Sequence, residues 1–174
     1  MATPVVARAV SGLWIRHAPH DAELLGRANP PADGRWQSGA IVSALYLADS
    51  AQTATAEWYR SLAERGFSPQ DYVPFEHHRW RLKLELADLS TRERLEAVGL
   101  GEPRPSRRTW AAFQPVGEQL WREGWAGLVA PSAARPGSLV MCVFIAGAWP
   151  PPGCVPLNAM TIDIVPPPPT GMTT

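Results

Sequence analysis

Residues 79–86 alternate between charged and apolar side chains, which is the pattern of a strand with one buried face. The apolar side chains occupy every second position, and arginine, lysine or glutamate fills the positions between them: Trp80, Leu82, Leu84 and Leu86 are the apolar members. Because successive side chains of a β-strand point to opposite faces, this segment predicts a half-buried strand. Such a strand requires partner strands and a second layer that covers its apolar face.

Other segments predict strands and helices that interleave along the chain. Two pairs have the spacing of a helix capping box, Asp49 with Gln52 and Ser90 with Glu93. The expected helices cover residues 50–65, 90–99 and 115–123, and the further expected strands cover residues 12–16, 41–47, 127–130 and 139–146. This order predicts an α+β fold: a single domain with a mixed, mainly antiparallel central sheet and flanking helices.

Length and composition favour one domain. With 174 residues and 45% hydrophobic content, the chain can bury one full core. We expect this domain at residues 1–150, with its core at about 13–146, followed by a Pro-rich tail at 151–174. The prolines at 166–169 exclude helix and central strand, so we expect an extended, frayed tail.

Charge and cysteine content exclude several classes of protein. Lysine plus arginine equals aspartate plus glutamate at 16 each, so no net field attracts nucleic acid or an anionic membrane. The nearly uncharged stretch 139–149 is about half of the roughly 20 residues that span a bilayer. Cys142 and Cys154 are too few for a disulfide framework, and the N-terminus lacks the apolar run of a signal peptide. We therefore expect a cytoplasmic protein.

Three side chains in consecutive segments together predict a nucleotide site: Arg35, Tyr46 and Glu57. An arginine can hold a phosphate, an aromatic side chain can stack on a flat ring, and a carboxylate can serve a reacting sugar carbon. Arg35 lies in a long stretch, from residue 17 to 38, that we expect to be a binding loop, and Tyr46 and Glu57 follow it. Each also has a plainer interpretation: Glu57 as a solvated glutamate paired with Arg60, Arg35 as a surface arginine and Tyr46 as a core residue.

Two histidine pairs raise the question of a metal site. His17 and His20 have an H-x-x-H spacing, and His77 and His78 are adjacent. The sequence contains neither the H-E-x-x-H motif nor a cysteine pair at zinc spacing, so we expect no metal. It also lacks a Walker A loop, a G-x-G-x-x-G turn and, around Ser132, the G-x-S-x-G elbow of serine hydrolases.

Four stretches occur in a characteristic order: Gly34–Trp36; Leu45–Ser50 followed by Ala56–Glu57; Leu86–Ser90 with Val98–Leu100; and Gly127–Ser132. Together they resemble the RES-domain family, the toxin component of RES-Xre toxin-antitoxin modules. The resemblance implies an ADP-ribosyltransferase-like fold and an enzyme that cleaves the bond between nicotinamide and ribose in NAD. The arginine, glutamate and serine for which the family is named look like Arg35, Glu57 and Ser132, which would be the catalytic residues.

The resemblance also implies how NAD would be bound, as a substrate and without a permanently bound cofactor. Arg16 and Arg35 would clamp its pyrophosphate through charge-assisted hydrogen bonds. Tyr46 would stack near the nicotinamide ring, and Trp36 would support the pocket wall. Gln37 stands where an asparagine is usual in the family.

Three functions remain open from the sequence. The first is an NAD-consuming toxin, either a glycohydrolase or a phosphorylase, whose acceptor is water or inorganic phosphate. The second is an ADP-ribosyltransferase that modifies a target protein, and the third is a catalytically inactive nucleotide-binding module. The resemblance implies an Xre-type antitoxin that blocks the NAD entrance. If exposed, the tryptophans at 110, 121 and 125 could form an interface between two copies of the chain.

Overall fold

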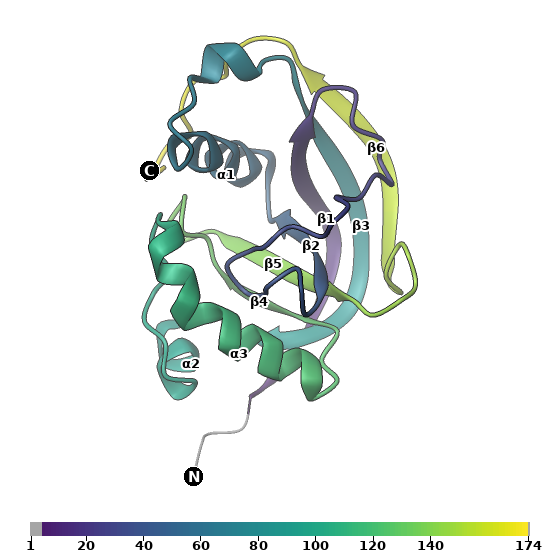
Figure 1. Cartoon of the computed structure of the whole chain (residues 1–174), viewed down its shortest axis with the longest axis vertical. Helices are drawn as coiled ribbons and strands as arrows, with labels where there is room; N and C mark the ends of the chain where they lie inside the picture. Colours follow the sequence, from purple (N-terminus) through teal and green to yellow (C-terminus); the bar gives the residue numbers. More distant parts are fainter. Residues whose placement is uncertain (1–4, 174) are drawn as a thin grey trace.

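The computed structural model describes residues 5–173. Within that range, six strands form one sheet: β1 (Ala7–Pro19), β2 (Ser43–Ala48), β3 (Phe75–Asp88), β4 (Gly127–Pro131), β5 (Leu139–Ile145) and β6 (Cys154–Ile162). The helices are α1 (Ala51–Ala63), α2 (Arg92–Ala97) and α3 (Trp110–Arg122), with short 3-10 turns η1 (Pro69–Tyr72) and η2 (Arg107–Thr109). The long strands β1, β3 and β6 curve side by side along one side of the molecule, and the helices lie on the other (Figure 1).

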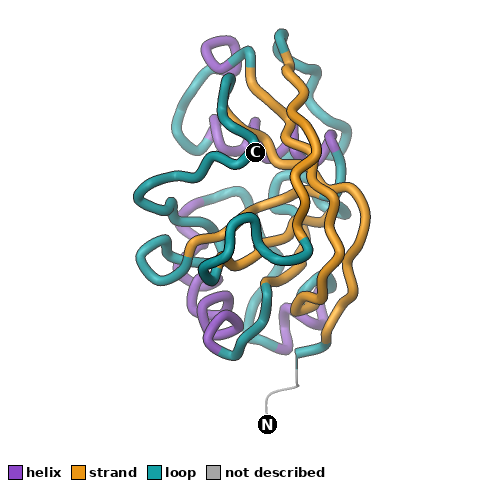
Figure 2. Tube along the Cα trace, turned by 90° about the vertical axis from the view of Figure 1, so that its right-hand side faces the viewer, coloured by secondary structure: helices purple, strands orange, loops and turns teal. Residues whose placement is uncertain are grey.

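The strands are ordered β1-β2-β5-β4-β3-β6, and β1 also pairs with β3 from Ala7↔Ala87 to Pro19↔Phe75. The pairings from β1 through β2, β5 and β4 to β3 therefore return to β1 and make a closed ring, with β6 added on the outer edge of β3. Only β3 and β4 run parallel among these strands of residues 5–173. The predicted α+β fold with a mixed, mainly antiparallel sheet is confirmed, and Figure 2, seen from the side of the long strands, shows them running along the length of the molecule.

The alternation that predicted a half-buried strand is confirmed in β3. Trp80, Leu82 and Leu86 are buried in one core cluster, and Leu84 packs against it, whereas the charged side chains between them are partly or fully exposed. Alternate positions of β2 and β5 complete that cluster, and the opposite faces of the same strands pack against α2 and α3 through a second cluster. The sheet therefore lies between two apolar layers over β2 and β5.

Helix α3 approaches the loop before β2 very closely. At Gly117, an added Cβ atom would lie 1.9 Å from the carbonyl oxygen of Trp36, so only a glycine fits there. The Trp36 ring is 1% exposed and meets the ring of Phe113 edge to face at 5.1 Å. This contact fixes the loop 34–37 against α3.

Both predicted helix caps are wrong by one residue. Ser50 caps α1 by accepting a hydrogen bond from Thr53 N, whereas Asp49 accepts one from Leu139 N and joins β2 to β5. Thr91 caps α2, whereas Ser90 is hydrogen bonded to Asp88. In each case the earlier side chain is bonded to a residue at the end of a strand, and the next hydroxyl accepts from the free N–H groups of the helix.

The expected strand at 12–16 is only the centre of β1, and the expected helix at 115–123 begins five residues earlier in α3. The structure also contradicts the predicted start of a Pro-rich tail at residue 151, because residues 154–162 form β6. Pro156 is compatible with this strand because β6 lies at the sheet edge, where a missing N–H leaves no neighbour unpaired, and the register shifts beside it.

The remaining tail is extended, as expected, but it is fastened to the domain instead of frayed. Tyr59 donates a hydrogen bond from its hydroxyl to Pro166 O at 2.5 Å, and Arg135 Nε donates one to Thr170 O at 3.1 Å. Thr173 N donates to Ala134 O at 2.7 Å. The tail therefore crosses α1 and the loop after β4, close to the C mark in Figure 1.

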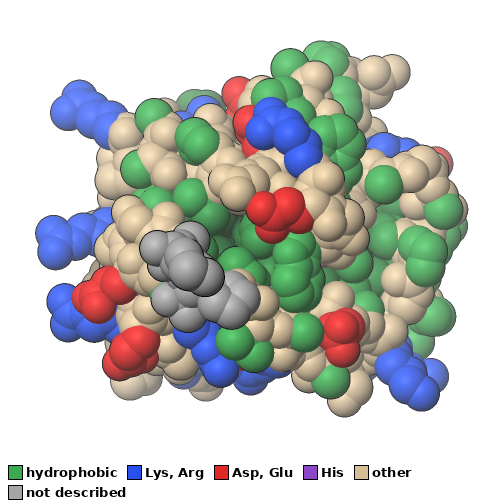
Figure 3. All heavy atoms as spheres, turned by 90° about the horizontal axis from the view of Figure 1, so that it is seen from below, with side chains coloured by type: hydrophobic (Ala, Val, Ile, Leu, Met, Phe, Trp, Pro, Cys, Tyr) green, Lys and Arg blue, Asp and Glu red, His purple; other side chains and the backbone are tan. Residues whose placement is uncertain are grey.

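The surface at the end that carries α2 and α3 intersperses basic, acidic and apolar side chains (Figure 3). Trp121 and Trp125 are partly buried against the second core cluster, and an interface between two copies of the chain stays a prediction. Among residues 5–173, the structure contains no helix with the length and apolar character needed to cross a membrane.

Candidate functional site

A cavity of about 480 Å³ lies between α1, the C-terminal half of β1, β2 and the loop before β2. A volume of several hundred Å³ is typical of small-molecule and cofactor sites. Five of the six site residues predicted from the sequence line it: Arg16, Arg35, Trp36, Tyr46 and Glu57. The sixth, Ser132, is buried between two residues that line the cavity, Pro131 and Ala133.

The Glu57 carboxylate is held from two sides. Ser132 Oγ donates a hydrogen bond of 2.8 Å to Glu57 Oε1, and Arg60 Nε donates one of 2.7 Å to Oε2. Arg60 also donates from Nη1 to Glu64 Oε1 at 2.6 Å, so it lies between two carboxylates. The side chains of Glu57 and Arg60 are each 15% exposed. The expected ion pair of Glu57 with Arg60 at i,i+3 does form, but both side chains line the cavity and do not lie on a solvated face of the helix.

Burial and charge compete in setting the pKa of Glu57. Burial favours the neutral acid, but the charge of Arg60 and the hydrogen bonds from Ser132 and Arg60 outweigh it and hold the pKa of Glu57 below its usual value. Burial likewise disfavours the charged form of Arg60, but the two carboxylates beside it raise its pKa above the usual value. Glu57 is therefore an oriented anion at neutral pH.

The Ser132 hydroxyl is aimed at Glu57 by its own loop. Ala134 N and Arg135 N both donate to Ser132 Oγ, at 3.2 and 3.0 Å. Because these donors occupy the lone pairs of the oxygen, its proton is left to point toward Glu57. Arg135 also donates to Gln52 Oε1 at 2.7 Å and to Thr53 Oγ1, which ties this loop to the start of α1.

Arg16 and His17 enter the cavity from β1. Burial lowers the pKa of Arg16, and burial also lowers the pKa of His17 to about 3. Glu57 opposes the change at His17, whereas Arg16 and Arg60 add to it. His17 is therefore a neutral side chain beside the Glu57 carboxylate, and the positive charge on this wall belongs to Arg16.

The guanidinium of Arg35 is already partly occupied. It donates hydrogen bonds of 2.8 Å to Thr109 Oγ1 and to Arg104 O, and it lies over the ring of Phe113 at 5.2 Å. Burial, reinforced by the charge of Arg60, lowers the pKa of Arg35 to about 10. A guanidinium has five N–H donors, so donors remain for a ligand after these two bonds. Arg35 thus supports the loop 104–109 in addition to lining the cavity.

The hydroxyl of Tyr46 is engaged with the loop before β2. It accepts a hydrogen bond from Trp36 N at 3.0 Å and donates one to Gln37 Oε1 at 2.8 Å. Gln37 is itself buried and donates to Ala32 O and Val42 O. The Tyr46 ring is therefore fixed at the cavity wall, and Trp36, which is almost fully buried, supports that wall from behind.

Sequence reasoning missed the position of Arg60 and the part played by the loop 104–109. The spacing of Glu57 and Arg60 was a visible signal, but the same spacing is common on exposed helix faces. Trp110, which follows the loop, lines the cavity, and so does Trp149, over whose ring Arg27 lies at 5.0 Å. No local motif marks these residues, because they meet only in the folded chain.

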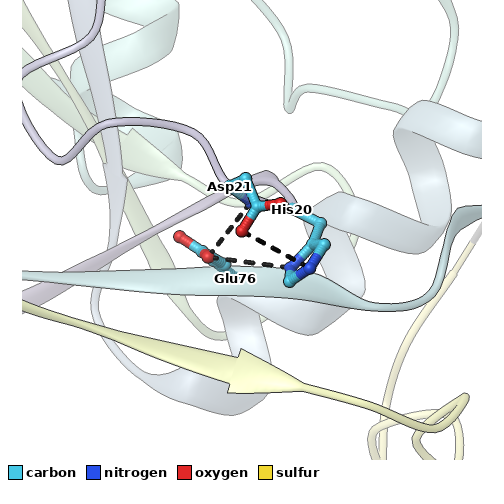
Figure 4. Close-up of side chains that lie close together, drawn as sticks. All are labelled: His20, Asp21 and Glu76. Carbon is cyan, nitrogen blue, oxygen red and sulfur yellow. Dashed lines mark hydrogen bonds and ion pairs between the residues drawn. The ribbon is translucent and has the colours of Figure 1, made fainter.

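The histidines do not meet as their sequence spacing suggested. His20 is close to Asp21 and Glu76, with His20 Nε2 at 3.4 Å from Asp21 Oδ1 and Nδ1 at 3.8 Å from Glu76 Oε1 (Figure 4). His17 lies in the cavity instead, and His77 is 3.4 Å from Thr55 Oγ1. One imidazole and two carboxylates are suitable metal ligands. However, Asp21 is 86% exposed, and these groups pair with one another. The absence of a bound metal therefore stays a prediction.

Comparisons with known proteins agree with the predicted family. Residues 7–154 match the RES domain family model. Proteins named NAD(+) phosphorylase MbcT, from Mycobacterium tuberculosis and Mycobacterium bovis, are 28% identical over 124 residues, which is 70% of this chain and 67% of theirs.

One solved structure is similar over most of the chain. It is the crystal structure of the M. tuberculosis MbcT-MbcA toxin-antitoxin complex, matched with a TM-score of 0.76 at 23% identity over 90% of this chain and 87% of that chain. At this level of identity, the likeness supports the fold alone.

Proposed function

Because the chain belongs to the RES domain family, we propose that it is an enzyme that breaks the bond between nicotinamide and ribose in NAD. The observation that carries the proposal is the Glu57 carboxylate, kept ionised by Arg60 and oriented by Ser132 at the wall of a 480 Å³ cavity. The activity in the name of the MbcT relatives supports the same substrate.

The proposed chemistry uses the negative charge of Glu57. When the glycosidic bond breaks, the electron pair leaves with the nicotinamide nitrogen, and positive charge develops on the ribose ring. A fixed carboxylate stabilises that charge in the transition state, where its effect is larger than in the ground state. Ser132 acts on Glu57 by holding it, and Arg60 keeps it ionised.

The remaining residues have binding roles in this proposal. Arg16 and the free donors of Arg35 bind the pyrophosphate, because guanidinium groups form paired, charge-assisted hydrogen bonds with phosphate oxygens. Tyr46 presents its ring to the nicotinamide, and Trp36 supports this wall. NAD is thus a substrate, and the proposal needs no resident cofactor.

We also propose that the protein acts as a toxin in the cytoplasm and is neutralised by an antitoxin of the Xre type. The support is that the solved structure with the same fold is a toxin-antitoxin complex. An antitoxin that covers the mouth of the cavity would prevent NAD from entering.

The acceptor of the ADP-ribose is water or inorganic phosphate in this proposal. The phosphorylase name of the relatives favours phosphate. Transfer to a side chain of a target protein is the competing possibility, and it would use the same cavity with a different acceptor.

The test is to measure nicotinamide release from NAD by the purified protein, with and without phosphate. Glu57→Gln and Arg35→Ala are compared with Glu85→Gln, whose carboxylate is exposed on β3. Loss of the Glu57 charge should reduce the rate by about a hundredfold or more, whereas Glu85→Gln should keep the wild-type rate. A parallel reaction with labelled NAD and cell lysate detects transfer to protein.

Two outcomes would reject parts of the proposal. If wild type releases no nicotinamide in any condition but NAD raises its melting temperature, the chain is a binding module without turnover. If label appears on a lysate protein and nicotinamide release depends on that protein, the acceptor is a protein side chain.

A further inference from the structure

A second hollow, of about 340 Å³, adjoins the main cavity at Arg60. Its lining contains Arg60, Ala63, Glu64, Pro105, Ser106, Arg107 and Arg108, and Arg60 is also part of the main cavity wall. The two spaces therefore share one guanidinium. This guanidinium is the one that donates to Glu57, at 2.7 Å.

The small hollow has a strong excess of positive charge. Three of its lining residues are arginines and one is a glutamate, so the net charge of its lining is 3 − 1 = +2. Glu64 contacts two of the arginines, with Arg60 Nη1 at 2.6 Å and Arg107 Nε at 3.8 Å from its carboxylate oxygens. The Glu64 carboxylate therefore lies between the two guanidinium groups, and Arg60 Nη2 and the remaining N–H groups of Arg107 stay available to a ligand.

The loop that supplies Arg107 and Arg108 is fixed in place. Arg35 holds it at both ends, through Arg104 O and Thr109 Oγ1, and the Arg107 guanidinium lies 4.9 Å from the centre of the Trp110 ring. The loop borders the small hollow through residues 105–108, and Trp110, the residue that follows the loop, lines the main cavity. A site fixed before its ligand arrives loses less entropy on binding.

We propose that this hollow binds a phosphate group that takes part in the reaction of the neighbouring cavity. Guanidinium groups match the oxygens of a tetrahedral phosphate. Arg107 and Arg108, with the donors of Arg60 that Glu57 and Glu64 leave free, favour an oxyanion in this small space. The proposal rests on the proposed function for its role in the reaction. The phosphate is either free inorganic phosphate, as the acceptor, or a phosphate group of the dinucleotide.

Free phosphate is consistent with a balanced reaction. One phosphate oxygen forms a bond to the anomeric carbon of the ribose as the carbon–nitrogen bond breaks, and the electron pair of that bond goes to the nicotinamide. Neutral nicotinamide and a ribose 1-phosphate of the ADP-ribose are the products. Arg60 contacts Glu57 directly, so a phosphate bound to Arg60 would be separated from the proposed catalytic carboxylate by one guanidinium group.

The test uses the double variant Arg107→Ala/Arg108→Ala. Both side chains are exposed, so their removal should leave the fold intact. The control is Arg81→Ala/Arg92→Ala, which removes two exposed arginines from β3 and α2. Nicotinamide release is measured over a range of phosphate concentrations and over a range of NAD concentrations, at constant ionic strength.

The two sources of phosphate give different results. If free phosphate is the ligand, the double variant should raise the KM for phosphate at least tenfold and leave the KM for NAD unchanged. If the ligand is a phosphate of the dinucleotide, the KM for NAD should rise by that factor, and activity should not require added phosphate. If both KM values stay within twofold of wild type, the proposal is wrong.

A binding measurement separates this site from the proposed activity. Inorganic phosphate should raise the melting temperature of wild type more than chloride at equal ionic strength does, and the double variant should lose the difference. If wild type releases no nicotinamide yet shows this difference, the proposed function fails and the phosphate site is supported. The absence of both the shift and any KM effect overturns the site.

Discussion

Ser132 Oγ donates a hydrogen bond of 2.8 Å to Glu57 Oε1 and thereby joins the loop after β4 to the middle of α1. In Ser132→Ala this donor is lost, and the pKa of Glu57 should rise toward its usual value because one of the interactions that favour the anion is gone. A hydrogen bond to a charged group is worth about 1.5–3 kcal/mol, so we expect a rate about 10- to 100-fold lower.

The shape of the pH–rate profile distinguishes this effect from general damage. Because the pKa of Glu57 rises in Ser132→Ala, the loss of activity on the acid side should begin at a higher pH than in wild type. Ser132→Thr, which keeps a hydroxyl, should restore part of the rate, and Ser11→Ala on the exposed part of β1 should change nothing. An unchanged acid limb in Ser132→Ala would show that Ser132 does not control the ionisation of Glu57.

His17 should make the folded state less stable in mild acid. Burial lowers its pKa to about 3, whereas an unfolded chain has a histidine pKa near 6.5, so the unfolded state takes up the proton first. The contribution of neutral His17 to the free energy of unfolding is therefore fully present above pH 6.5 and is lost as the pH falls toward 3. From pH 7 to pH 5 the loss attributable to His17 is about 2 kcal/mol.

The measurement is the free energy of unfolding by urea at pH 7 and pH 5, for wild type and His17→Asn. The variant should lose about 2 kcal/mol less than wild type over this interval. The absolute stability of the variant does not matter for this comparison, because each protein is its own reference. Equal losses in the two proteins would mean that His17 is protonated in the folded state already at pH 5.

Gly117→Ala should detach α3 from the loop before β2. The added Cβ would lie 1.9 Å from the backbone oxygen of Trp36, which has no freedom to rotate away. We expect a loss of about 3 kcal/mol or more in the free energy of unfolding. Gly101→Ala is the matched control, because nothing lies within 4 Å of its added Cβ and the change there should stay within about 0.5 kcal/mol.

Both glycine variants are measured by urea unfolding monitored through tryptophan fluorescence. Trp36 is packed between α3 and the cavity wall, so its environment reports the same contact. If Gly117→Ala were as stable as Gly101→Ala, α3 would not be fixed against Trp36 O as closely as the structure shows.

Deletion of residues 164–174 should loosen the loop that carries Ser132. The Tyr59 hydroxyl and Arg135 Nε would lose their acceptors, Pro166 O and Thr170 O, and Ala134 O would lose its donor, Thr173 N. At about 1 kcal/mol for each hydrogen bond, we expect a loss of about 1–3 kcal/mol in the free energy of unfolding. Hydrogen exchange should rise at Ala134 N and Arg135 N, which donate to Ser132 Oγ, while the exchange of β3 amides stays unchanged.

The parts of the fold that follow from periodic patterns were predictable from the sequence. The alternation in β3 and the helical spacing of α1 depend on side chains only a few positions apart, and both elements were correctly expected. Strand β6 was not expected, because its proline and weak alternation are acceptable only at a sheet edge, and the edge is created by the distant β3.

The candidate site divides in the same way. The sequence motifs brought Glu57, Arg35 and Ser132 forward, and the structure places them around one cavity region. The sequence could not assign Arg60 to the site, because the pair that it forms with Glu57 at i,i+3 has the same spacing whether water or a cavity surrounds it. The sequence also could not show that Arg35 holds the loop 104–109, because Arg35 and its partner Arg104 are about 70 residues apart in the chain.

The position of Arg60 between two hollows has a thermodynamic consequence. Since Arg60 lines both, we expect a ligand in either space to change the free energy of binding in the other. By linkage, whatever factor phosphate applies to the affinity for NAD, NAD must apply to the affinity for phosphate. A compound that fills only the small hollow would therefore alter the affinity of the large one for NAD, and its coupling factor could be measured equally well from either side.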